Sequence, residues 1–180
     1  MKIPVLLLTA VASAAGADWN TYLGDKASSQ YSALQQITPE NVAGLKVAWT
    51  YRSGGADANN RSQIQCNPLI VGGVLYGTSP DFQLFALDAA TGVERWRFDP
   101  AKDGLTKSGV NRGLVHWGEG DEARIFYANA HFLHAIDTRT GKRIPTFGKQ
   151  GSVDLKEGMG RELNGLYLAA NTPGIIYRDL

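Results

Sequence analysis

The stretch from Ala86 to Trp96, which reads A-x-D-x-x-T-G-x-x-x-W, constrains the fold of this chain more than any other feature. Its apolar start is typical of a strand, and Asp88 can cap backbone N–H groups in the turn that follows. Gly92 can adopt the positive φ that closes such a turn. The preceding residues 71–77 (Val-Gly-Gly-Val-Leu-Tyr-Gly) read as two further strands broken by glycines. Four short strands joined by tight turns form one blade of a β-propeller.

The same pattern occurs a second time. Residues 84–88 (Leu-Phe-Ala-Leu-Asp) return as 133–137 (Leu-His-Ala-Ile-Asp), and the Thr-Gly pair at 91–92 returns at 140–141. The two aspartates lie about 49 residues apart, which is within the range of propeller blade periods. The strand before each aspartate is apolar, as expected of a strand packed between neighbouring sheets. The sequence therefore predicts an all-β chain made of consecutive propeller blades.

Tryptophans recur with the units. Trp49 stands where Trp96 stands in the next unit, whereas the second full unit has Pro145 near the equivalent position. Taken alone, Trp96 is equally typical of a sheet core. Its fixed offset from the Asp-Thr-Gly turn favours docking between blades, where an indole buries a large surface and needs a partner for its N–H. Residues 172–180 resemble the opening of the first unit at 67–75, so the chain is predicted to hold about two to three blades.

An open set of blades leaves a strand edge and an apolar blade face uncovered, and no stretch here is typical of a polar cap. We therefore interpret the sequence as a truncated or partial chain, which is not expected to fold well alone.

Residues 1–17 have the features of a secretory signal peptide. Lys2 precedes an apolar core, and Ala15-Gly16-Ala17 offers a small-residue cleavage site. The apolar core is shorter than the roughly 20 residues of a membrane span, although an uncleaved anchor is the alternative. These features predict export to a periplasm, with the propeller part at residues 18–180.

Charge and cysteine content limit the function further. The net charge is +1 with both signs mixed along the chain, and no stretch is typical of a nucleic-acid patch or a membrane-surface helix. Cys66 is the single cysteine, which excludes a disulfide within the chain. We expect it to be a small buried residue at a strand start rather than a reactive thiol.

A series of blocks carries a family resemblance. The blocks are residues 18–25 (Asp-Trp-Asn-Thr-Tyr-Leu-Gly-Asp), 31–42, 45–49, 67–69, 84–92, 111–113 with Trp117, and 147–155. In this order they resemble the N-terminal part of pyrroloquinoline-quinone (PQQ) dependent alcohol and glucose dehydrogenases. The blocks extend over essentially all of residues 18–180, which makes the resemblance far more specific than a lone blade motif.

The resemblance implies an eight-bladed propeller with PQQ on its axis beside a calcium ion. It also implies oxidation of an alcohol or a sugar by hydride transfer to PQQ, with electrons passing to a cytochrome or a membrane quinone. The family's calcium ligands and catalytic aspartate come from later blades, so no residue of this chain is assigned as the general base. The fragment alone is expected to be inactive. The protein is expected in the periplasm, either free or associated with the membrane.

Two residues are the candidate cofactor contacts by the same resemblance. Arg112 lies in a segment similar to the family stretch whose arginine meets the quinone, and a planar guanidinium suits a carboxylate. The alternative is a solvated surface arginine. Gln65 stands where many relatives carry a glutamate that bonds the cofactor, and a turn residue is the alternative for it. The vicinal cysteine pair of many alcohol-oxidising relatives is absent before Arg112, which mildly favours the glucose-dehydrogenase-like branch.

Other polar residues are interpreted as structural. His131 and His134 are expected in one strand, where residues three apart point to opposite sides, so a zinc site is disfavoured. His116 is expected to pack in a blade or at the surface, and the acids between 119 and 122 to form a solvated hairpin loop.

Two other functions remain open at this stage. One is a non-enzymatic propeller scaffold of the outer-membrane assembly type, which would not need Arg112 and its flanks or the opening at 18–42. The other is an inactive product of a degraded gene. Further blades with a late Asp and Asn beyond Leu180 would favour the dehydrogenase.

Overall fold

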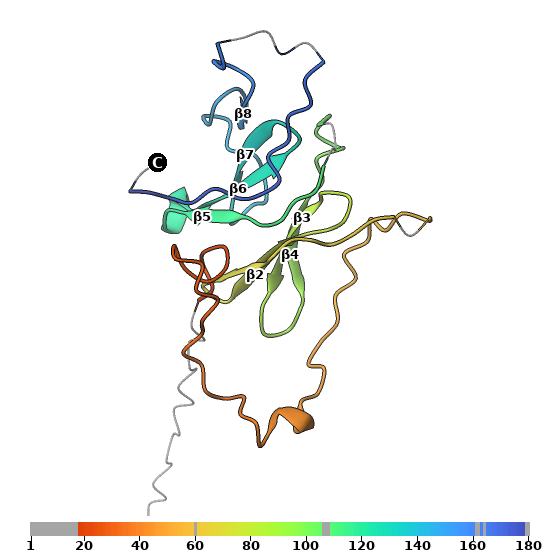
Figure 1. Ribbon diagram of the computed structural model, residues 1–180, viewed down its shortest axis with the longest axis vertical. Helices are drawn as coiled ribbons and strands as arrows, with labels where there is room; N and C mark the ends of the chain where they lie inside the picture. Colours follow the sequence, from red (N-terminus) through yellow and green to blue (C-terminus); the bar gives the residue numbers. More distant parts are fainter. Residues whose placement is uncertain (1–17, 60, 106–108, 161–162, 164, 179–180) are drawn as a thin grey trace, which may run out of the picture.

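The computed structural model describes residues 18–59, 61–105, 109–160, 163 and 165–178. The expected signal peptide at 1–17 lies outside the described residues. Two four-stranded antiparallel sheets follow each other along the chain, the first yellow to green and the second cyan to blue in Figure 1. We call them blade one and blade two.

Each strand pairs with the next one in the sequence, so both sheets are simple meanders. Blade one consists of β1 (Leu69–Val71), β2 (Val74–Thr78), β3 (Leu84–Asp88) and β4 (Glu94–Phe98), and blade two of β5 (Val115–Trp117), β6 (Arg124–Asn129), β7 (Phe132–Asp137) and β8 (Ser152–Asp154). Two short 3-10 turns, η1 (Val42–Gly44) and η2 (Gly120–Glu122), are the helical elements among the described residues. The prediction of consecutive four-stranded units is confirmed, with two blades formed.

The turns that follow the apolar strands β3 and β7 make the hydrogen bonds that their sequences predict. The Asp88 carboxylate accepts the backbone N–H of Thr91 at 3.0 Å and its hydroxyl at 2.9 Å. Gly92 follows with a φ of 72°, a conformation that strains other residues. Asp137 accepts the N–H three residues further on at 2.9 Å, and Gly141 has a φ of 67°. Both aspartates therefore serve the turns of their blades.

Trp49 and Trp96 each dock on the turn of the blade that follows them. The indole N–H of Trp49 donates to the carbonyl of Ala89 at 3.2 Å, and that of Trp96 donates to the carbonyl of Thr138 at 2.7 Å. Both acceptors stand one residue after the turn aspartate of their blade. The docking role predicted for Trp96 is thus confirmed, and Trp49 repeats it one unit earlier.

The hydrophobic core lies between the two blades. Tyr127 of β6 is fully buried, its hydroxyl donates to the carbonyl of Phe82 at 2.5 Å, and its ring meets Phe98 edge-on at 6.2 Å. The buried cluster draws on both sheets and comprises Leu69, Val74, Tyr76, Phe82, Leu84, Ala86, Phe98, Leu114, Ile125, Tyr127 and Ile136. Burial of this shared apolar surface is the main favourable term that holds the blades together.

The flanking repeat copies do not form strands. Residues 45–51 and 172–178 carry the pattern of strands but make no sheet, because no described strand of their own blade lies beside them. Two apolar side chains of the first flank are accordingly exposed, Leu45 at 58% and Val47 at 82%, whereas Trp49 is half-buried. Figure 1 shows the orange segment around η1, which precedes this flank, looping away from both sheets.

Candidate functional site

The segments that open successive repeats, around Asn67, Arg112 and Asn171, lie next to one another. We call them the inner segments, and the place where they meet the inner edge. The backbone N–H of Asn67, just before β1, donates to the carbonyl of Arg112, just before β5, at 2.9 Å. The N–H of Arg112 in turn donates to the carbonyl of Asn171 at 2.9 Å. The first contact belongs to a parallel bridge between Asn67 and Gly113. Arg112 is therefore held by its backbone in the middle of three neighbouring segments.

Asn111 fixes the direction in which Arg112 points. Its side chain is 6% exposed, its amide donates to the carbonyl of Ala128 at 3.2 Å, and its oxygen accepts the Thr78 hydroxyl at 3.4 Å. Successive side chains of an extended chain point in opposite directions. Burial of Asn111 between the blades therefore directs the Arg112 side chain away from the core, at the edge where the inner segments meet, and it is exposed.

Gln65 lies close to the same end of β1 but faces a separate hollow. It is half-buried, and its amide donates to the side-chain oxygen of Gln63 at 2.8 Å. The hollow has a volume of about 270 Å³ and is lined by Arg61, Ser62, Gln63, Gln65, Thr78, Ser79, Pro80, Phe82, Gly109, Val110 and Asn111. Arg112 is not part of this lining. The structure thus brings the segments of Gln65 and Arg112 together without joining their side chains.

Cys66 sits between these residues and the core. It packs against the buried cluster, is half-buried rather than fully buried, and its thiol lies 3.6 Å from the carbonyl oxygen of Asn67. Burial raises the pKa of the Cys66 thiol. A thiol that is harder to ionise is a weaker nucleophile, which agrees with a structural role.

The three histidines occupy unrelated environments. His134 is fully buried in β7 with its Nδ1 2.6 Å from the Ser152 hydroxyl, and burial lowers the pKa of His134 to about 4. His116 is half-buried in β5, where burial also lowers its pKa. His131 lies in the turn before β7, 3.7 Å from an Asp154 oxygen, so its expected place in a strand was wrong.

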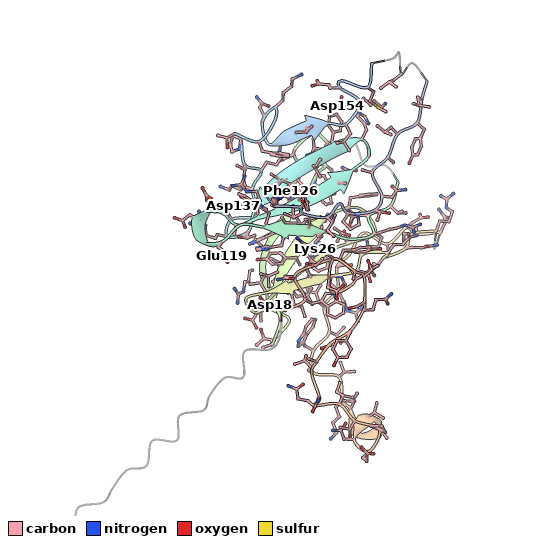
Figure 2. All side chains as sticks on the ribbon, turned by 60° about the vertical axis from the view of Figure 1, so that its left-hand side comes forward. Asp18, Lys26, Glu119, Phe126, Asp137 and Asp154 are labelled. Atoms are coloured by element: carbon pink, nitrogen blue, oxygen red, sulfur yellow. The ribbon has the colours of Figure 1, made fainter. Side chains whose placement is uncertain are left out.

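The acids at 119–122 form an exposed loop around η2, as predicted, and Asp121 pairs with Arg139. Figure 2 shows Glu119 near Asp137 at one end of blade two, with Asp154 at the other end. Within the described ranges, no group of three or more His, Cys, Asp or Glu side chains is placed to hold a metal ion.

The comparisons with known proteins agree with the blade architecture. A family model described as the β-propeller domain of PQQ glucose, ethanol and alcohol dehydrogenases matches residues 19–180. The chain belongs to this family.

Relatives in the PQQ dehydrogenase family include enzymes of different substrates. The chain is 32% identical to quinoprotein glucose dehydrogenase A of Acinetobacter calcoaceticus, over 93% of this chain and 24% of that protein. It is 36% identical to the 1-butanol dehydrogenase (cytochrome c) of Thauera butanivorans, over 80% of this chain and 20% of that protein. The chain therefore spans about a quarter or less of the length of these relatives.

A solved structure confirms the fold. The quinohemoprotein alcohol dehydrogenase from Comamonas testosteroni superposes with a TM-score of 0.63 and 28% sequence identity, over 78% of this chain and 20% of that chain. In the part of the chain that the structure describes, no helix has the length and apolarity needed to cross a bilayer.

PQQ carries three carboxylates, and the donor at this edge whose chemistry suits a carboxylate is the guanidinium of Arg112. Arg112 is exposed, and among the described residues no ion pair uses its guanidinium. A guanidinium binds a carboxylate through paired N–H donors. The described residues form no comparable oxygen cluster for calcium.

Sequence reasoning missed the asparagines that build this edge. Asn67, Asn111 and Asn171 each stand at the start of an inner segment, and each takes part in the hydrogen bonds around Arg112. The Asn-Pro pair at 67–68 and the Asn-Thr-Pro run at 171–173 were the available pattern. An asparagine repeated at the opening of each unit would have indicated a shared structural task.

Proposed function

We propose that this chain is the N-terminal part of a PQQ-dependent dehydrogenase that oxidises alcohols or sugars. The observation that carries the proposal is the exposed guanidinium of Arg112, held by backbone hydrogen bonds to both neighbouring inner segments. Membership of the family and the names of the relatives support the reaction class.

PQQ, when bound, supplies the two-electron acceptor for oxidation of a carbon that carries a hydroxyl group. The part of this chain is to bind and orient: Arg112 pairs with a carboxylate of the cofactor, while Asn111 keeps the arginine directed to the inner edge. Gln65, which lines a separate hollow near the same end of β1, provides a neutral amide that can donate and accept. The general base and calcium ligands are assigned to no described residue.

The cellular setting follows from the same proposal. The features of residues 1–17 support export to the periplasm. One relative is named for cytochrome c, and one of the relatives from Gluconobacter oxydans is named an alcohol dehydrogenase (quinone). A cytochrome or a membrane quinone is accordingly the proposed electron acceptor.

Titration of PQQ into the whole cofactor-free protein tests the assignment. Arg112→Ala should weaken PQQ binding by the roughly 1.5–3 kcal/mol of a charged hydrogen bond, which is about 10- to 150-fold in Kd. Arg112→Lys should recover part of the loss because it keeps the charge but not the planar fork. Arg52→Ala, at another exposed arginine, is the matched control and should bind as the wild type does.

Equal affinity in the wild type and Arg112→Ala would exclude Arg112 as a cofactor contact. A well-folded whole protein that does not take up PQQ at all would instead favour the non-enzymatic scaffold.

A further inference from the structure

The segment Asp18–Lys26 lies on the inner side of blade one. Trp19 and Ile70 of β1 exchange two backbone hydrogen bonds, at 2.8 and 2.9 Å. The carboxylate of Asp18 accepts the N–H of Gly72 at 3.0 Å. Because the other edge of β1 is paired with β2, Trp19 covers the edge that faces away from the rest of the blade.

The same segment continues across blade two and the next inner segment. A Cβ atom on Gly113 would lie 2.7 Å from the Tyr22 ring and 3.0 Å from Pro173. The remaining space between these parts is only about 50 Å³, lined by Asn20, Thr21, Tyr22, Lys26, Leu114, Val115, His116, Gly174, Ile175 and Ile176. Tyr22 therefore packs directly against the backbone next to Arg112.

A compact loop keeps the segment in this position. Gly24 has a φ of 98° and its N–H donates to the carbonyl of Thr21 at 3.0 Å, which reverses the chain. The ring of Trp19 lies against Gly24, where a Cβ atom would be 2.9 Å from the ring. Figure 1 shows the red loop beside β2 and β5, and Figure 2 labels its ends at Asp18 and Lys26.

In a propeller the innermost strands surround the central axis, so a segment on the inner side of three successive inner segments lies in the axial channel. We propose that Asp18–Lys26 is the floor of that channel, and that Tyr22 closes it directly beneath Arg112. Tyr22 is thus a positioning residue. It supports the Gly113 backbone, and it keeps the cofactor from leaving through the side of the channel that Tyr22 closes. This rests on the proposed function only in naming PQQ as the bound group.

Release of PQQ from the whole protein tests the floor. Tyr22→Ala should release PQQ about tenfold faster with little change in association, because lost packing acts mainly on dissociation. Tyr22→Phe keeps the ring and should behave as the wild type. Tyr31→Ala is the matched control, since that tyrosine is 74% exposed. Equal release rates for Tyr22→Ala and Tyr31→Ala would overturn the proposal.

Hydrogen–deuterium exchange in the cofactor-free wild type separates this inference from the proposed function. A floor requires slow exchange of the Trp19 and Ile70 amides, and faster exchange at Arg112 in a mild Tyr22→Leu variant. Slow exchange with that response, in a protein that does not bind PQQ, would keep the floor and reject the cofactor assignment. Unprotected Trp19 and Ile70 amides in the wild type would reject the floor itself.

Discussion

The ring of Trp96 lies so close over Gly141 that a Cβ atom there would be 2.6 Å from ring carbon Cε3. Trp49 has the same relationship to Gly92, also at 2.6 Å. The glycine of each Asp-Thr-Gly turn therefore has two tasks, since it adopts positive φ and also leaves room for the indole of the preceding unit. This explains why the tryptophan and the glycine recur together.

Gly141→Ala should destabilise the protein by more than the backbone strain alone. A Cβ atom would strain the φ of 67° and also displace the Trp96 ring, for a combined cost of about 2–4 kcal/mol. Gly104→Ala is the matched control, because its φ is 72° but no atom lies within 4 Å of the added Cβ. Chemical unfolding of the whole protein measures the free energy of unfolding of both variants. Equal losses of stability would show that the Trp96 ring moves aside without an energetic cost.

The buried His134 should make stability depend on pH. Its pKa is lowered to about 4 by burial, from an ordinary value of 6.5. The unfolded chain therefore binds a proton between pH 6.5 and 4 that the folded chain does not bind. Its contribution is fully present above pH 6.5 and is lost progressively as the pH falls towards 4.

His134→Phe should flatten this dependence by up to about 2–3 kcal/mol across the window. Phenylalanine is a reasonable replacement because Phe85 stands at the equivalent position of blade one. His116, whose pKa is also lowered by burial, should leave a smaller residual slope. His131→Phe is the control, and unfolding midpoints at pH 7, 6 and 5 give the comparison. An unchanged slope in His134→Phe would contradict the assignment.

The repeat could be predicted because its determinants are local. Asp88, Thr91 and Gly92 form their turn within five consecutive residues, and the apolar residues of β3 before the turn indicate a strand. The docking of Trp96 could be predicted too. A tryptophan at a fixed offset from such a turn needs an apolar surface to pack on and a hydrogen-bond acceptor for its indole N–H.

The edge around Arg112 could be predicted only in part. The resemblance indicated the arginine, but its backbone bond to Asn171 joins segments far apart in the sequence, and their contact depends on how the blades pack. His131 was placed in a strand because its neighbours are apolar, yet Ala130 has a φ of 53° and starts the turn one residue earlier. The floor segment was missed because its position depends on three distant segments at once.

Asn111→Ala should cost about 1–3 kcal/mol of stability, because it leaves the buried carbonyl of Ala128 and the hydroxyl of Thr78 without their partner. Asn59→Ala is the matched control, since that side chain is exposed, bonds among the described residues only to Asp57 of its own loop, and should change stability by less than about 0.5 kcal/mol. Urea midpoints of the two variants decide the point. Equal midpoints would mean that Asn111 does not anchor the arginine segment.

The 180-residue chain alone should show no dehydrogenase turnover. Its described residues supply the arginine and the channel floor that we propose, but no cluster that could hold a metal ion, and the family's base is expected in later blades. Dye reduction with an alcohol or a sugar, added PQQ and Ca²⁺ should therefore not exceed a blank of PQQ without protein. A rate above that blank which disappears in Arg112→Ala would show that these two blades already assemble a working site, and the general base would then have to be sought among their own acids.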